Sequence, residues 1–176
     1  MKTASVLRQK SSLQESVLEI LNQQMAFEAH SSALYLSISA WCYAQGLRGT
    51  GEFFKKQSEE EREHMMKIFN YIAHAGALAV SPEVKNIERN FTDLRSVLVM
   101  ALEQEIQITE NFNKMSEHCQ KVRDYQTARF LQWYLDEQYE EEAQARRCIE
   151  IYDQMNPKDA IFDIDRAIND LKKAEE

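Results

Sequence analysis

Glycine and proline are scarce in this 176-residue chain, which has four glycines and two prolines. Folds built from many short strands need frequent turns, and tight turns depend on these two residues. Their scarcity argues against a β-sandwich or barrel and favours a few long helices. No apolar run approaches the roughly 18 residues that would suggest a membrane span. With 44% hydrophobic residues, the chain can nevertheless bury a sizeable core.

Basic residues are also in the minority, because 21 Lys and Arg face 29 Asp and Glu and give a net charge of −8. An acidic surface disfavours nucleic acid and anionic membranes, so we expect neither as a partner. The first residues carry no secretory or lipidation signal, and we expect a cytoplasmic location. Cys42, Cys119 and Cys148 are odd in number and far apart. This spacing argues against a disulfide framework and against a Cys-x-x-Cys metal site.

Apolar residues recur at helical spacing in five segments. The predicted helices cover about residues 13–45, 50–76, 93–119, 124–155 and 157–171. Capping signals mark their starts: a capping box at Ser12–Glu15, then Thr50, Thr92 or Asp93, Asp124, and Asn156 before Pro157. We interpret residues 1–11 as a short N-terminal extension and residues 12–176 as a single domain.

The links between these helices predict how they are arranged. Two links have about five residues, so the first helix is antiparallel to the second and the third to the fourth. The middle link has about 15 residues and reaches up to roughly 50 Å when extended, whereas the second helix is about 39 Å long. Such a link can run the full length of the bundle, which makes the second and third helices parallel. The sequence therefore predicts an all-α four-helix bundle with one long crossover and a short fifth helix at the C-terminus.

Each long helix carries one glutamate on its apolar stripe: Glu28, Glu61, Glu105 and Glu141. Glutamates are almost never fully buried without partners. At 1.5 Å per residue, the four positions lie within about a turn of the same height in a bundle of this topology. His64 follows Glu61 by three residues and shares its face, and Gln138 precedes Glu141 by three. Four carboxylates, one imidazole and one amide are therefore expected to meet near the middle of the core.

Four unpaired carboxylates in a low-dielectric interior would take up protons or destabilise the fold unless cations balance them. Two divalent ions carry a charge of +4, which cancels four glutamates if the imidazole stays neutral. Mostly oxygen donors with one imidazole favour iron or manganese over a sulfur-rich zinc site. Taken singly, such glutamates more often belong to solvated helix faces, and a buried histidine is more often merely hydrogen-bonded. The coincidence of four glutamates at one height favours a metal site.

Four segments carry a resemblance to a known family: Asn22–Glu28 (NQQMAFE), Glu60–Met65 (EEREHM), Phe130–Tyr134 (FLQWY) and Asp136–Glu142 (DEQYEEE). In these segments the chain resembles the ferritin family, and more closely its non-haem bacterial type. The resemblance covers nearly the whole chain, from about Ser12 to the fifth helix. It implies a di-iron ferroxidase centre, in which one iron is bound by Glu28, Glu61 and His64 and the other by Glu61, Glu105 and Glu141.

Five residues receive further roles from this resemblance. Gln138 would lie beside the dioxygen position. Tyr35, one heptad beyond the first ligand, corresponds to the family's tyrosine near the centre and could donate an electron. Glu60, Glu137 and Glu140 match the third iron site of bacterial ferritins, which would lie toward the inner surface of the assembly.

The resemblance also implies a hollow shell of 24 chains around an iron oxide mineral. Haem-containing bacterioferritins carry Met directly after the glutamate of the second helix, where this chain has Arg62, so we expect no haem. Bacterioferritins and rubrerythrins repeat Glu-x-x-His on the last bundle helix, where this chain has Gln138-x-x-Glu141. We therefore expect an iron-storage ferroxidase that oxidises Fe(II) with O2 or H2O2. Two alternatives stay open: a fixed di-iron oxidoreductase without storage, and a metal-free helical scaffold or binding protein.

Overall fold

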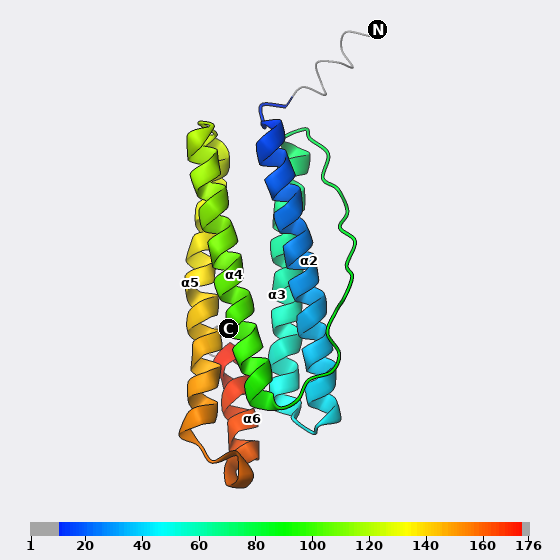
Figure 1. The fold of residues 1–176 in the computed structure, drawn as a ribbon, viewed down its shortest axis with the longest axis vertical. Helices are drawn as coiled ribbons and strands as arrows, with labels where there is room; N and C mark the ends of the chain where they lie inside the picture. Colours follow the sequence, from blue (N-terminus) through cyan, green and yellow to red (C-terminus); the bar gives the residue numbers. More distant parts are fainter. Residues whose placement is uncertain (1–10, 174–176) are drawn as a thin grey trace.

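A computed structural model of the chain describes residues 11–173. Over this range it contains no strand and five helices: α2 (Glu15–Ala44), α3 (Arg48–His74), α4 (Leu94–Lys121), α5 (Tyr125–Gln154) and α6 (Pro157–Lys173). Figure 1 shows the first four as a bundle, with α6 packed at one end. The predicted all-α four-helix bundle with a short fifth helix is thereby confirmed. The expected N-terminal extension, residues 1–11, lies outside the described residues apart from Ser11.

The link between α3 and α4 runs along the bundle, as Figure 1 shows, so these two helices are parallel as predicted. Side chains of α2 hold the link in place. Asn22 accepts a hydrogen bond from the Val80 amide at 2.7 Å, and Ser37 donates one to the Glu88 carbonyl oxygen at 2.6 Å. None of the helices within residues 11–173 is long and apolar enough to cross a membrane.

Local capping explains where α4, α5 and α6 begin. Asp93 accepts a hydrogen bond from the Ser96 amide at 2.8 Å, and Asp124 accepts one from the Thr127 amide at 3.0 Å. Asn156 accepts an amide hydrogen bond in the same way at the start of α6. Each of these bonds satisfies a donor that the first turn of a helix leaves without a partner.

Two predicted N-caps are wrong, although each helix begins within two residues of the predicted position. α2 begins at Glu15 after Gln14, whose side chain makes no capping bond, so Ser12 does not form the predicted capping box. α3 begins at Arg48, which leaves Thr50 inside the first turn rather than at the cap. The residue before α3 is Leu47, and its side chain makes no capping bond either.

The start of α3 is capped instead by Asp165 of α6. Its carboxylate accepts hydrogen bonds from the Gly49 amide at 2.8 Å, the Thr50 amide at 2.7 Å and the Thr50 hydroxyl at 2.8 Å. Gly49 permits this close approach, because a Cβ there would lie 2.4 Å from the backbone oxygen of Asp165. Asp165 and Thr50 are 115 residues apart, so no local pattern could reveal this cap.

Replacing Asp165 by alanine should lower the free energy of unfolding by about 2 kcal/mol, because three donors at the start of α3 lose their acceptor. Urea denaturation of the purified variant measures the change. Asp163→Ala is a suitable control, since Asp163 is exposed and pairs with Arg166 on its own helix at 2.8 Å. An equal loss in both variants would contradict the capping role of Asp165.

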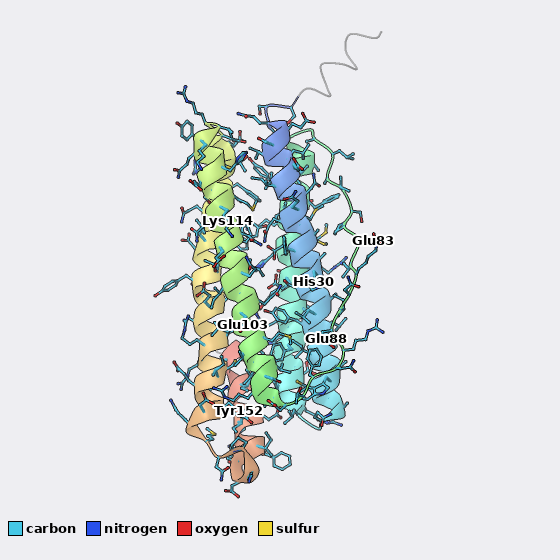
Figure 2. All side chains as sticks on the ribbon, viewed as in Figure 1. His30, Glu83, Glu88, Glu103, Lys114 and Tyr152 are labelled. Atoms are coloured by element: carbon cyan, nitrogen blue, oxygen red, sulfur yellow. The ribbon has the colours of Figure 1, made fainter. Side chains whose placement is uncertain are left out.

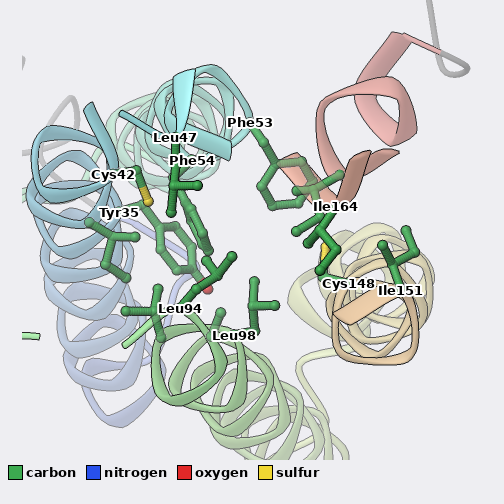
Figure 3. Packing of buried hydrophobic residues seen from close by; sticks show 14 of the residues in the cluster. Tyr35, Cys42, Leu47, Phe53, Phe54, Leu94, Leu98, Cys148, Ile151 and Ile164 are labelled. Atoms are coloured by element: carbon green, nitrogen blue, oxygen red, sulfur yellow. The ribbon is translucent and has the colours of Figure 1, made fainter. Parts of the chain in front are cut away.

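Two clusters of buried apolar side chains fill the bundle. One contains Phe54, Leu98 and Cys148 and continues to Ile164 of α6, as Figure 3 shows. The other contains Leu21 and Phe112 and occupies the remaining length of the bundle. All three cysteines are buried within these clusters, and none forms a disulfide with another.

The four glutamates predicted to form the site lie between the two clusters. On each bundle helix, residues of one cluster precede the glutamate and residues of the other follow it. Other acidic and basic residues, such as Glu103 and Lys114 of α4, are exposed on the outer surface (Figure 2). The fold therefore produces a polar layer near mid-height, between two clusters of apolar side chains.

Candidate metal centre

Glu28 of α2 and Glu61 and His64 of α3 meet in this polar layer. Their side chains are buried, with 0%, 1% and 5% exposure. His64 Nδ1 lies 3.9 Å from Glu28 Oε2 and 3.7 Å from Glu61 Oε2. The Glu-x-x-His spacing brings the last two together, because positions i and i+3 share a helix face. Among the described residues, no other three histidine, cysteine, aspartate or glutamate side chains have ligand atoms that all lie within 4.8 Å of one another.

One ligand atom of each residue has no hydrogen-bond partner: Glu28 Oε2, Glu61 Oε2 and His64 Nδ1. Buried polar atoms are almost always hydrogen-bonded, so three unpartnered atoms at one point are unusual. A single cation would satisfy all three. Two carboxylate oxygens and one imidazole nitrogen suit iron or manganese. The residues present therefore fit a metal ion.

The protonation of these carboxylates is strongly affected by burial. Burial raises the pKa of Glu28 and of Glu61 well above the usual range, and neighbouring carboxylates raise both further. Burial, followed by the charge of Glu141, also raises the pKa of Glu105 to about 8. Without cations, the cluster therefore keeps protons that a bound metal would displace.

Glu105 of α4 is held by two hydrogen-bond donors. Tyr35 of α2 donates to Glu105 Oε1, and Gln138 of α5 donates to Oε2 at 3.1 Å. Burial and the nearby Glu105 raise the pKa of Tyr35 well above its ordinary value, so its hydroxyl keeps its proton. The structure thus places two of the predicted residues, Tyr35 and Gln138, in contact with the carboxylate of a third, Glu105.

Glu141 of α5 lies at the edge of the polar layer and is half-buried. Its Oε2 accepts a hydrogen bond from Gln57 Nε2 at 2.7 Å. Burial raises the pKa of both Glu61 and Glu105, and the negative charge of Glu141 raises both further. The ligand atoms of these three glutamates do not converge as closely as those of Glu28, Glu61 and His64. A second iron between Glu61, Glu105 and Glu141 stays a prediction.

Two buried glutamines that hold site carboxylates were not among the predicted site residues. Gln24 donates to Glu28 Oε1 at 2.7 Å, and Gln57 donates to Glu141. Each glutamine stands four residues before a predicted ligand, Glu28 or Glu61, and therefore lies on the same helix face. A polar residue on the buried stripe one turn before a ligand is the signal that points to them.

Aromatic side chains hold His64 in place. The Tyr134 hydroxyl donates to the His64 carbonyl oxygen at 2.8 Å. The rings of Trp133 and Tyr134 meet the imidazole edge-on, with centroids 5.5 and 5.9 Å away. Lys67 Nζ lies 3.2 Å from the centroid of the Trp133 ring. The hydrogen bond fixes the backbone of α3 at His64, and the two rings cover one side of the imidazole.

A surface groove of about 750 Å³ runs between α3 and α5. His64 and Glu141 line it, so the groove reaches the buried group. The three glutamates predicted as a third iron site, Glu60, Glu137 and Glu140, line it as well. Glu60 and Glu137 are half-buried, Glu140 is exposed, and burial raises the pKa of Glu137. The fold therefore brings these three residues to one surface that adjoins Glu141.

The chain is similar to known proteins over most of its length. A family model described as "Ferritin-like domain" matches residues 18–155. A "probable bacterial non-heme ferritin-like protein" of Haemophilus influenzae is 40% identical over 130 residues, which cover 74% of this chain and 79% of that protein. A bacterial non-heme ferritin of Campylobacter jejuni is 38% identical over 138 residues, which cover 78% of this chain and 83% of that protein.

Solved structures show the same likeness. An open pore ferritin from the hyperthermophilic archaeon Archaeoglobus fulgidus has a TM-score of 0.86 and 28% identity, over 91% of this chain and 98% of that chain. A Chlorobium tepidum ferritin has a TM-score of 0.80 and 36% identity, over 89% of this chain and 96% of that chain. The shared fold thus extends over nearly all of both chains.

Proposed function

The chain belongs to the ferritin family, and from this premise we propose that it is an iron-storage ferroxidase. Fe(II) is its substrate, and either O2 or H2O2 is the oxidant. Two Fe(II) ions bind in the polar layer, and after oxidation Fe(III) passes to a mineral inside a shell of 24 copies of the chain. The protein acts in the cytoplasm and has no nucleic acid or membrane partner. It binds no haem, because Arg62 stands where haem-containing bacterioferritins carry Met.

The three unpartnered ligand atoms of Glu28, Glu61 and His64 carry this proposal. In a metal-free scaffold, a proton shared between Glu28 and Glu61 would give those carboxylates a partner, but His64 Nδ1 would remain buried without one, at a cost of about 1–3 kcal/mol. Apolar side chains at the same positions would avoid that cost. A cation site gives all three atoms a partner, which supports the metal-binding function over the scaffold.

Charge matching supports two Fe(II) ions per chain. Glu28, Glu61 and His64 bind the first, and Glu61 bridges to the second, which Glu105 and Glu141 also bind. Four carboxylates and two Fe(II) sum to zero when His64 is neutral. Two electrons from the pair reduce one O2 to H2O2, or one H2O2 to two waters, with two protons taken up in either case. Oxidation adds a charge of +2 without adding ligands, which favours release of the product.

The remaining predicted residues take supporting roles in this proposal. Tyr35 and Gln138 both donate hydrogen bonds to Glu105, so both contact a ligand of the second Fe(II). Tyr35 can supply an electron, and Gln138 borders the position of the oxidant. Glu60, Glu137 and Glu140 form a third iron site in the groove between α3 and α5, beside Glu141.

Iron loading tests the proposed function. Metal-stripped protein receives excess Fe(II) in air and is separated by size, and iron per chain is counted in each fraction. We expect many irons per chain in a very large assembly. About two irons per chain in a small oligomer would instead identify a fixed di-iron oxidoreductase. If no iron is retained, the storage function is wrong.

A further inference from the structure

Gln57 of α3 is a buried glutamine, and only one of its two side-chain polar atoms is hydrogen-bonded. Its side chain is 4% exposed. Nε2 donates to Glu141 Oε2 at 2.7 Å, whereas Oε1 has no hydrogen-bond partner. Gln57 lines a small core cavity of about 10 Å³ together with Tyr35, Glu105 and Glu141. A cavity of this size has room for about one water molecule.

Glu141 is the most exposed of the four predicted glutamate ligands, since Glu28, Glu61 and Glu105 are buried. It is half-buried and lines both this core cavity and the surface groove between α3 and α5. Its carboxylate therefore stands at the boundary between the site and solvent. The backbones of α3 and α5 make no close contact over the described residues. The hydrogen bond from Gln57 therefore links α3 to a carboxylate of α5.

Glu28 and Glu105 are held by glutamines in the same way. Gln24, 2% exposed, donates to Glu28 at 2.7 Å, and Gln138, 1% exposed, donates to Glu105 at 3.1 Å. An amide fixes the orientation of a carboxylate and leaves its negative charge in place, whereas a lysine or arginine would neutralise it. The charge thus stays available to a cation.

We propose that Gln57 is a positioning residue for the second Fe(II). Its N–H group holds Glu141 toward Glu105, and its carbonyl oxygen offers a neutral donor to the cation or to a water bound to it. The inference rests on the proposed function, since that function assigns Glu141 to the second iron. Without Gln57, Glu141 turns into the groove and the second ion binds more weakly. The first ion, bound by Glu28, Glu61 and His64, is unaffected.

Replacement of Gln57 by methionine tests this role, because methionine has a similar length and no N–H group. Glu141 reaches solvent and can be hydrated in the variant, so the fold should persist. Metal-stripped protein is titrated with Co(II) and followed by calorimetry and by the absorption of bound Co(II). We expect the second Co(II) to bind about 10- to 100-fold more weakly, as is usual when an outer partner of a metal ligand is lost. The first Co(II) should bind as in the wild type.

Two further variants separate positioning from general damage. Gln132→Met is the matched control, since Gln132 is an exposed glutamine of α5 that bonds Asp136, and it should bind Co(II) like the wild type. Gln57→Asn keeps the amide but is one methylene too short to reach Glu141, and it should show the same loss as Gln57→Met. Equal weakening of both Co(II) ions would overturn the positioning role.

A double-mutant cycle shows whether Gln57 acts through Glu141. If it does, Gln57→Met combined with Glu141→Gln should bind the second Co(II) as weakly as Glu141→Gln alone. If the two substitutions weaken binding of the second Co(II) additively, or if Gln57→Met binds it as tightly as the wild type, the positioning role is wrong. The proposed function would not be affected by either result. A wild-type protein that binds no Co(II) would overturn the proposed function, and the positioning role with it.

Discussion

Replacing Glu61 by alanine should slow Fe(II) oxidation by at least about 100-fold. The loss of an outer partner of a metal ligand costs 10- to 100-fold, and Glu61 itself binds both ions in the proposed site. The fold should persist, because alanine removes a buried carboxylate whose negative charge the metal-free core does not favour. In the wild type, the charges of Glu105 and Glu141 repel the ionised Glu61, in addition to the cost of its burial. The alanine variant is free of this repulsion. Initial rates of Fe(II) oxidation, followed by the absorbance of Fe(III), measure the effect.

Glu59 provides the matched control for Glu61. It belongs to the same run of three glutamates but is exposed. Glu59→Ala should therefore oxidise Fe(II) at the wild-type rate. Both variants should assemble to the same size as the wild type, which a sizing column checks. Equal initial rates in Glu61→Ala and the wild type would show that the buried group is not the site of oxidation.

The architecture of the bundle could be predicted from the sequence because its determinants are local. Helical spacing of apolar residues gives the helices, and link length decides which neighbours are antiparallel. The cap of α3 could not be predicted, because it is Asp165 of α6. Thr50 has the side chain of an N-cap residue, yet its hydroxyl donates to that carboxylate from inside the first turn.

The ligands of the candidate site could be predicted because an ionisable residue is conspicuous on the apolar stripe of a helix. Glu28, Glu61 and His64 stand out for this reason, and the structure brings them together. Gln24 and Gln57 do not stand out, because a neutral amide on a buried stripe conflicts little with its surroundings. Their role depends on which carboxylate each one reaches. For Gln57 that carboxylate is on another helix, 84 residues away.

The metal-free protein should become less stable as pH rises from about 5 to 8. The pKa values of Glu28, Glu61 and Glu105 are raised in the folded protein, so the folded state binds more protons than the unfolded state in this range. The stabilising contribution is complete below the ordinary pKa of 4.5 and is lost as pH rises through the folded pKa, which is about 8 for Glu105. Each group contributes a slope of up to about 1.4 kcal/mol per pH unit. Urea denaturation at several pH values measures this slope.

Two variants identify the groups responsible for the slope. Glu105→Gln removes one of the raised carboxylates and should reduce the slope between pH 5 and 8. Glu103→Gln changes an exposed glutamate on the same helix and should leave the slope unchanged. If the wild-type protein shows no loss of stability over this range, the three carboxylates do not retain protons in the folded state.

Saturation with Co(II) should reverse the sign of this pH dependence. A metal ion binds the ionised carboxylates and neutral imidazole, so protons compete with it for the same atoms. As pH falls, the metal is displaced and its contribution to stability is lost. The stability of the metal-free protein should therefore fall as pH rises, whereas the stability of the protein saturated with Co(II) should rise. Parallel slopes with and without Co(II) would show that the metal binds elsewhere, because only competition at the buried carboxylates couples the two equilibria in this way.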